Sequence, residues 1–315
     1  MSGAVAVGVF DGLHLGHLQI LRRAVASARE RGGRCVVVSF DPHPDTVLAT
    51  PFHVLPPLTP LPEKRERLAG LGVRDFEVLP FTRELASLLP EEFVKRHLVR
   101  PLAPHTLIVG ENFALGRGRA GSVPRLRDLG ASLGFAVEAV PLLEVDGGPV
   151  TSTRIRGLLG EGRVREAARL LGRRYGLNGS VVAGAGIGRT LGVPTANLRL
   201  HEEKLVPGHG IYAVWSRIGG ERVWRPAAMS IGVRPTFGGQ VRTLEIHLIG
   251  WSGELLGRDL EVEFVEWLRP ELRFESREAL AGAMRADLAE ARRQLSDTAA
   301  AAAPGDPPRP GDPGR

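Results

Sequence analysis

The residues best suited to chemistry lie near the start of the chain, in the stretch GVFDGLHLGH from Gly8 to His17. An apolar run precedes this stretch and an amphipathic run follows it, which predicts a turn between a buried strand and a helix. A glycine-bearing turn lets the backbone approach phosphate, and a helix N-terminus supplies oriented N–H donors and a positive dipole. His14 and His17 can donate hydrogen bonds to phosphate oxygens there. A metal site is the weaker interpretation, because no third ligand stands at a known spacing.

Three further stretches place polar residues where strands are expected to end or helices to begin. They are FDPHP from Phe40 to Pro44, VGENFALG from Val109 to Gly116, and TSTRIR from Thr151 to Arg156. Asn112 can bond a base or a sugar, and hydroxyl and guanidinium groups at a helix start suit ATP phosphates. Rigid turns and helix caps are the ordinary alternative for each stretch taken alone. Because ligands of open α/β sheets bind beyond the carboxyl ends of the strands, we expect all four stretches to converge on one cleft.

A second glycine-rich stretch, AGAGIGRTLGVPTANL, spans Ala183 to Leu198. It fails as a P-loop, because Ala183 stands in place of the first glycine and Arg189 in place of the lysine. Backbone N–H groups of such a loop can still cradle phosphate, although a flexible loop between strands is the simpler alternative. Farther on, LEIHLIG alternates polar and apolar residues, so Glu245 and His247 taken alone are outward residues of a strand.

The first half of the chain alternates apolar strand-like runs with amphipathic helix-like runs. This alternation predicts βαβ units and a parallel sheet covered on both faces. A proline-rich segment at 42–62 is long for a connection, so we expect it to be functional or mobile. Strands are expected at 4–9, 34–40, 76–81, 106–110 and 135–142, and helices at 17–32, 62–71, 90–98 and 123–134.

The second half has a different texture. Helical patterns at 151–174 give way to short runs rich in β-branched and aromatic residues, broken by glycine. Such runs predict a small antiparallel barrel or sandwich, and one long helix at 276–294 is expected to close it. The strand-like runs lie at 175–184, 210–232, 241–250 and 258–269.

Composition narrows the function classes. With 315 residues, two domains are expected, and no apolar run is long enough to span a membrane. A single cysteine excludes an internal disulfide, and no signal peptide is recognisable, so we expect a cytoplasmic protein without a membrane partner. The net charge of +6 comes from arginines scattered among acids, without a basic block or aromatic platforms. We therefore expect small-molecule substrates and no nucleic acid.

Taken in order, these motifs resemble those of the bacterial bifunctional riboflavin kinase/FMN adenylyltransferases, also called FAD synthetases. The first four stretches resemble the N-terminal module, which is a nucleotidyltransferase. GRTLGVPTANL resembles the riboflavin kinase signature, and the resemblance extends over residues 4 to 295. Further stretches that fit the kinase are GIYAV (210–214), IGVRPTF (231–237), LEIHLIG (244–250) and LRPELRFES (268–276).

The resemblance implies an α/β fold with an N-terminal doubly wound parallel-sheet nucleotidyltransferase (Rossmann-like) domain at 1–160. A helical linker at 161–171 and a C-terminal antiparallel β-barrel riboflavin kinase domain with a closing helix at 172–296 follow. The remaining residues, 297–315, lack core residues and are expected to be a disordered tail. The implied reactions are phosphorylation of riboflavin to FMN by ATP and adenylylation of FMN to FAD with release of pyrophosphate. Both require Mg²⁺.

The resemblance also implies residue roles. His14, His17 and Glu245 are expected to be catalytic, and Thr195 and Asn197 to bind the metal. In the adenylyltransferase, ATP and phosphate are expected to contact Gly8, Phe10, Asp11, Gly12, Asn112, Ser152, Thr153 and Arg156. In the kinase, the corresponding residues are Gly186, Gly188, Arg189, Gly192, Thr195 and Asn197.

Some features depart from the family pattern. The family has a segment before the first strand, whereas this chain starts almost on it. Either the start is trimmed or the leading segment is missing, and a missing segment is expected to weaken the edge of the adenylyltransferase site. Thr151 replaces the family's first serine of Ser-Ser-Thr, and Ser230 replaces an asparagine near the flavin side.

Two alternative functions fit these motifs less well. The first is an adenylyltransferase for another phosphorylated metabolite, which would have no use for the PTAN motif. The second is a flavin- or nucleotide-binding regulator that has lost catalysis, which would not need the intact catalytic residues. A monomer or transient homo-oligomer is expected.

Overall fold

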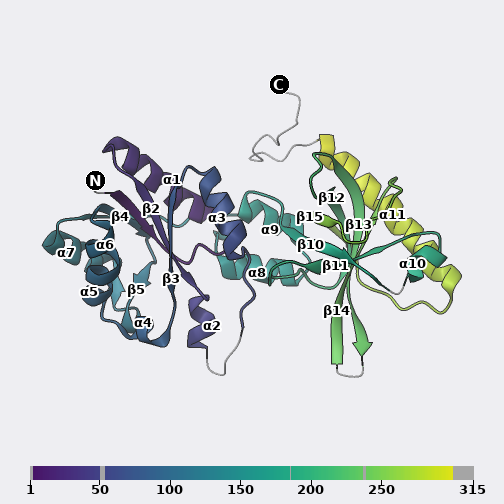
Figure 1. Ribbon diagram of the computed structural model, residues 1–315, viewed down its shortest axis with the longest axis horizontal. Coiled ribbons are helices and arrows are strands. Elements are labelled where there is room, and N and C mark those ends of the chain that lie inside the picture. Colours follow the sequence, from purple (N-terminus) through teal and green to yellow (C-terminus); the bar gives the residue numbers. More distant parts are fainter. Residues whose placement is uncertain (1–2, 50–53, 185, 237–238, 301–315) are drawn as a thin grey trace. The chain divides into compact units, whose positions relative to one another are not determined.

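The computed structural model describes residues 3–49, 54–184, 186–236 and 239–300 (Figure 1). Its contacts divide the chain into two compact units, Met1–Ser152 and Thr153–Arg315. The first predicted domain ends at residue 160, eight residues after the first unit. The predicted limits of 1–160, 161–171 and 172–296 stay a prediction. Of the predicted tail at 297–315, residues 301–315 lie outside the described residues, as do Ala185 and Phe237 of the two kinase motifs.

The first unit is built on one parallel sheet of five strands in the order β3-β2-β1-β4-β7. The order reverses beside β1, so the carboxyl ends of β1 and β4 flank the switch point of a doubly wound sheet. Continuous apolar sequence makes the central strands, because a sheet with helices on both faces buries every residue. The strands are β1 (Gly3–Val7), β2 (Cys35–Asp41), β3 (Asp75–Pro80), β4 (Pro104–Gly110) and β7 (Ala136–Val140).

Helices cover both faces of this sheet. On one face, α1 (Leu15–Glu30) and α3 (Leu61–Gly70) pack Leu21, Ala24 and Leu68 against the strands. The other face is covered by α5 (Pro90–Phe93), the π-helical turn η1 (Val94–Val99) and α7 (Val123–Leu133), which pack their own apolar side chains against the strands. The single helix expected at 90–98 is thus α5 followed by η1. The remaining elements are α2 (Pro44–Leu48), α4 (Arg83–Ser87), α6 (Arg100–Leu102), η2 (Arg117–Arg119), β5 (Ala114–Leu115), β6 (Gly121–Ser122), β8 (Glu144–Val145) and β9 (Gly148–Pro149).

The second unit is a closed antiparallel barrel with the strand order β10-β11-β14-β13-β12-β15. Buried and half-buried residues alternate along β12 except at Ala213, which is buried in a second cluster outside the barrel core. Closure decides between the two predicted architectures in favour of a barrel. Its strands are β10 (Gly176–Val182), β11 (Ala196–Leu200), β12 (Gly210–Ile218), β13 (Trp224–Thr236), β14 (Gly239–Leu248) and β15 (Asp259–Arg269).

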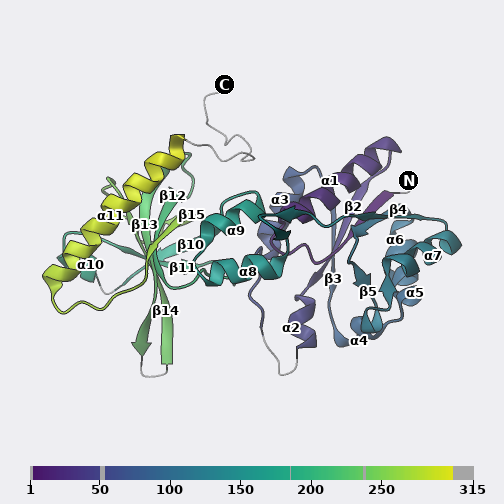
Figure 2. The same ribbon diagram turned by 180° about the vertical axis from the view of Figure 1, so that it is seen from behind.

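Helix α11 (Arg277–Ala300) lies along the barrel (Figure 2). Ala291 and Leu295 bury against Ala213, Ala228 and Val265 of the strands. The bidentate ion pair of Arg269 with Asp287 fixes the helix to the end of β15. The helix extends four residues into the segment expected to be a disordered tail.

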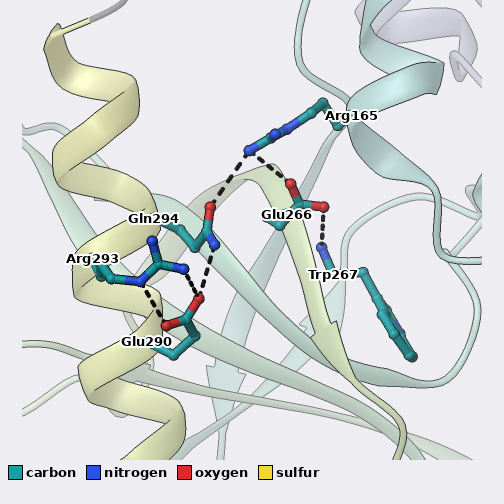
Figure 3. A network of polar contacts seen from close by, with 6 residues as sticks. All are labelled: Arg165, Glu266, Trp267, Glu290, Arg293 and Gln294. Carbon is teal, nitrogen blue, oxygen red and sulfur yellow. Dashed lines mark hydrogen bonds and ion pairs between the residues drawn. The ribbon is translucent and has the colours of Figure 1, made fainter.

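Polar side chains connect three elements of the second unit (Figure 3). Arg165 of α9 (Val164–Leu171) pairs with Glu266 of β15 at 2.7 Å and reaches Gln294 of α11 at 3.5 Å. Gln294 in turn donates to Glu290, which also pairs with Arg293. Helix α9, which follows α8 (Ser152–Gly160), therefore packs on the barrel through charged as well as apolar contacts.

Candidate functional site

The turn between β1 and α1 runs from Gly8 to His14 and is mostly buried. Phe10 and Leu13 have φ values of 50° and 42°, and Gly12 has one of 87°. Non-glycine residues seldom adopt this left-handed region, and they hold it only where the surrounding structure over-determines them. The turn is therefore a firmly held piece of backbone at the carboxyl end of the central strand.

Both predicted catalytic histidines lie where this turn becomes a helix. His14 is the N-cap of α1, and its Nδ1 accepts the backbone N–H of His17 at 3.3 Å. An accepting Nδ1 leaves the proton of a neutral imidazole on Nε2, which makes Nε2 a donor. The two rings stack with centroids 3.6 Å apart, and Phe10 meets His17 edge-on at 5.4 Å. This places two imidazoles at a helix N-terminus, where anions are favoured.

Asp11 has a supporting place beside this pair. Its carboxylate is 2 % exposed and accepts the backbone N–H groups of Leu58 and Thr59 at 3.0–3.1 Å. These donors belong to the proline-rich segment expected at 42–62, of which residues 50–53 lie outside the described part. The carboxylate thereby ties that segment to the turn. This role suits a negatively charged group, whereas direct contact with a phosphate would bring two negative charges together.

Lys64 is a site residue that the sequence analysis missed. It is 6 % exposed, and its Nζ donates to the carbonyl oxygen of Val9 at 2.8 Å. The hydroxyl of Ser39 donates to the same oxygen at 2.9 Å. Burial lowers the pKa of Lys64, while the charges of Asp11 and Asp41 act against that shift. In the sequence, Lys64 is one of three lysines and lies in a predicted amphipathic helix. Neither fact indicates that its ammonium group bonds to Val9.

Asn112 and Ser152 also come to this part of the first unit. Val7 and Gly110 end the neighbouring parallel strands β1 and β4. Asn112 follows Gly110 as an exposed residue whose backbone oxygen accepts from Arg119. Ser152 Oγ donates to the backbone oxygen of Asp11 at 2.8 Å, which fixes the start of α8 to the turn. The first unit therefore contains the strand ends at which three of the predicted stretches lie, together with Ser152, the first residue of α8, from the fourth stretch.

Thr153 and Arg156 lie on α8 beyond Ser152. Thr153 is exposed and Arg156 half-buried. Ser152 and Arg156 are four residues apart, so they share one face of the helix.

In the second unit, the glycine-rich loop connects β10 to β11 through the short helix α10 (Ile187–Thr190). Gly186 and Gly192 have φ values of 70° and 77°, conformations that favour glycine, and Arg189 is exposed. A Cβ on Gly184 would collide with the side-chain amide of Asn197. A Cβ on Gly188 would collide with the Val193 carbonyl and approach Thr195 Oγ1. The loop therefore lies directly against the polar residues of the PTAN motif.

Three polar side chains of the predicted kinase site meet across β11 and β14. Thr195 Oγ1 donates to Glu245 Oε2 at 3.1 Å, and Asn197 pairs with Glu245 in the strand register. Hydroxyl, amide and carboxylate oxygens are the ligands that Mg²⁺ prefers, so the donor set fits this ion. Among the described residues, no group of three or more His, Cys, Asp or Glu side chains is arranged to hold a metal ion.

Two family models match the chain, each over one of these regions. The FAD synthetase model matches residues 2–154, and the riboflavin kinase model matches residues 171–295. The fold and the two groups of polar residues therefore define a two-domain transferase, with a doubly wound nucleotidyltransferase-like sheet and a kinase barrel. This confirms the fold class predicted from the motifs.

Curated relatives match nearly the whole chain. A bifunctional riboflavin kinase/FMN adenylyltransferase of Pseudomonas fluorescens is 41 % identical and covers 92 % of each chain. The enzyme of the same name from Listeria monocytogenes is 35 % identical over 91 % of this chain and 90 % of its own. The chain belongs to the bifunctional riboflavin kinase/FMN adenylyltransferase family. Family membership confirms the predicted pair of enzyme activities.

One solved structure that resembles the chain closely is described as a macrolide-efflux protein from Streptococcus pneumoniae. Its TM-score is 0.85, at 30 % identity. The match covers 92 % of this chain and 94 % of that chain. Within the described residues, no helix has the length and apolar character needed to cross a membrane.

Proposed function

We propose that the turn from Gly8 to His17 is the adenylyl-transfer site. A phosphate oxygen of FMN attacks the α-phosphorus of ATP, the bond to the β-phosphate breaks, and pyrophosphate leaves. The protein contributes positioning and stabilisation of charge rather than covalent chemistry. His14 and His17 donate to oxygens of the α-phosphate as negative charge develops, and the helix N-terminus adds to this field. The stacked pair and the Nε2–H donor of His14 support this assignment.

The remaining predicted residues bind the nucleotide in this proposal. Backbone groups of Gly8, Phe10 and Gly12 approach the phosphates, and Asn112 contacts the base or ribose. Ser152 and Arg156 of α8 hold the β- and γ-phosphates, and Thr153 of the same helix also contacts ATP. Asp11 and Lys64 hold the turn through Leu58, Thr59 and Val9, and contact of Asp11 with the ATP phosphates stays a prediction.

We propose that Glu245 is the general base of the kinase. Its carboxylate takes the proton of the riboflavin 5′-hydroxyl as that oxygen attacks the γ-phosphorus of ATP, and ADP leaves. Thr195 and Asn197 hold Mg²⁺, and Gly186, Gly188, Arg189 and Gly192 surround the phosphates. When bound, Mg²⁺ neutralises phosphate charge and polarises the phosphoryl group. The contact of Thr195 with Glu245, opposite Asn197, is the observation that carries this proposal.

The proposal is tested by incubating the purified protein with riboflavin, ATP and Mg²⁺ and separating the flavins over time. Riboflavin should fall, FMN should rise first, and FAD should follow with release of pyrophosphate. Omission of Mg²⁺ should stop both steps. If riboflavin stays unchanged and supplied FMN is also inert, neither assignment holds.

The substrates are small molecules, and we propose that the protein acts on them as a monomer or a transient homo-oligomer. A cytoplasmic location suits the supply of ATP, and a buried free cysteine, Cys35, is compatible with reducing surroundings. Light scattering during turnover tests the first point, and fractionation of cells tests the second.

A further inference from the structure

The imidazole of His247 lies at a place where the strand pairing of the kinase site ends. His247 follows Glu245 by two residues on β14, so both side chains project from the same face of the strand. The register of β11 with β14 pairs Asn197 with Glu245 and Ala196 with Ile246, and goes no further. Pro194, two residues before Ala196, has no N–H with which to extend the ladder.

The side chain of His247 makes a hydrogen bond beyond that end. Its Nδ1 lies 2.7 Å from the carbonyl oxygen of Pro194. A carbonyl oxygen only accepts, so Nδ1 carries the hydrogen and donates it. Both the neutral Nδ1–H tautomer and the imidazolium keep this donor, so the bond does not depend on the charge of the ring.

The segment held by this bond contains a residue of the proposed metal site. Pro194 directly precedes Thr195, whose Oγ1 donates to Glu245 Oε2 at 3.1 Å. On the other side, the N–H of Val193 donates to the carbonyl oxygen of Gly188 at 2.9 Å. Residues 193–195 are thus fastened at three points. Those at Pro194 and Thr195 come from side chains of β14, two residues apart.

We propose that His247 is a positioning residue of the kinase. Its Nδ1–H holds the Pro194 carbonyl and thereby keeps Thr195 Oγ1 against the Glu245 carboxylate, and the ring itself does not touch the reacting atoms. This proposal rests on the proposed kinase roles of Thr195 and Glu245. It gives the second polar residue of LEIHLIG a function that the alternation of the strand does not show.

Three substitutions in the full-length chain separate the donor from the shape of the ring. His247→Asn puts an amide N–H near the place of Nδ1, His247→Gln puts one near the place of Nε2, and His247→Leu has no donor. We expect Leu and Gln to slow FMN formation roughly tenfold, the size of one lost hydrogen bond, and Asn to restore most of the rate. The concentration of Mg²⁺ for half-maximal rate should rise in the Leu and Gln variants and stay near the parent value in the Asn variant. An Asn variant as slow as the Leu variant would overturn the proposal.

A double-mutant cycle with Thr195→Ala tests whether His247 acts through Thr195. In the Thr195→Ala background, His247→Leu should have little further effect, because the group that it positions is already gone. Additive losses would show that His247 acts by another route and would contradict the proposal. FAD formation from supplied FMN by the same preparations should be unchanged, which controls for protein quality. An inactive parent kinase would instead refute the proposed function, whereas an active parent with equally active variants would refute only this inference.

Discussion

The two phosphate-handling regions of this chain are supported in different ways. Around the first, the supporting side chains are buried: Asp11, His14 and Lys64 are 2 %, 5 % and 6 % exposed. Around the second, the loop residues Gly186 and Arg189 are exposed, and order comes from contacts across the strands.

This difference predicts different sensitivities. A buried turn held by a carboxylate and an ammonium group is sensitive to the loss of either side chain. The backbone group that was bonded to the lost side chain is then buried without a hydrogen-bond partner. The glycine-rich loop packed against Asn197 is sensitive to added atoms at Gly184 and Gly188, because a Cβ at either position would collide with its neighbours. Variants of each kind can therefore confirm or break the comparison.

The largest effect is expected from Glu245→Gln, which keeps the volume of the side chain and removes the base. FMN formation should fall roughly 10²- to 10⁴-fold, the usual contribution of a positioned general base. FAD formation from supplied FMN should continue at the parent rate, measured by chromatography of the flavins. Joint loss of both activities in a folded variant would show that the two regions are not independent.

His14→Ala makes the reciprocal test. Removing a donor from the developing charge should slow FAD formation by roughly 10²-fold or more and leave FMN formation unchanged. The measurement is the rate of pyrophosphate release with FMN and ATP, compared with ADP release from riboflavin and ATP. An adenylylation rate equal to that of the parent would end the assignment of His14.

Gly184→Ala tests the crowded loop of the kinase. The added methyl group displaces the Asn197 side chain rather than backbone, so the barrel should stay folded while FMN formation falls about tenfold. Gly282→Ala on α11 is a matched control, because a Cβ there meets nothing within 4 Å. Kinetics at several Mg²⁺ concentrations check the result. Equal rates for the two variants would show that the loop tolerates the methyl group.

Lys64→Met tests the buried support of the first region. Loss of the bond to Val9 should loosen the turn and slow FAD formation about tenfold, with no effect on the kinase. Lys95→Met removes an exposed lysine of the same unit and should leave both rates unchanged. If the two lysine variants behave alike, Lys64 does not position the turn.

The last prediction concerns Cys35, to which neither proposed reaction assigns a role. Burial, with a smaller contribution from Asp75, raises the pKa of its thiol to about 11. At pH 8 the native thiol should react with iodoacetamide about 100-fold more slowly than the unfolded chain, because the thiolate is the reactive form. The raised pKa also stabilises the fold below pH 9, and this contribution is lost as pH rises from 9 to 11. Rapid alkylation of the native protein at pH 8 would contradict this burial.

Much of the fold followed from sequence patterns, and the limits have physical causes. Strand and helix alternation predicted the sheet and placed His14 and His17 at the start of α1, because those patterns are local. The choice between barrel and sandwich required strand pairing, since a period of two serves both architectures. The extension of α11 to Ala300 was missed because the alanine-rich tail composition was interpreted as disorder, although alanine strongly favours helix.

The supports of the sites were less predictable than the predicted catalytic residues. Asp11 accepts from residues 47 and 48 positions away, and Lys64 reaches Val9 across 55 positions. Motifs name residues of the reaction, whereas such long-range contacts depend on the packing of α3 and its preceding segment. The same holds for His247, whose bond to Pro194 spans 53 positions.

Mixing the two disabled variants tests the central claim, which is that the adenylyltransferase site and the kinase site work independently of each other. Glu245→Gln alone should make no FMN from riboflavin within the assay time, and His14→Ala alone should stop at FMN. With both present, FMN released by the His14→Ala protein should become the substrate of the Glu245→Gln protein, and FAD should accumulate. If the mixture forms no FAD while the parent protein does, the account of two independent sites is wrong.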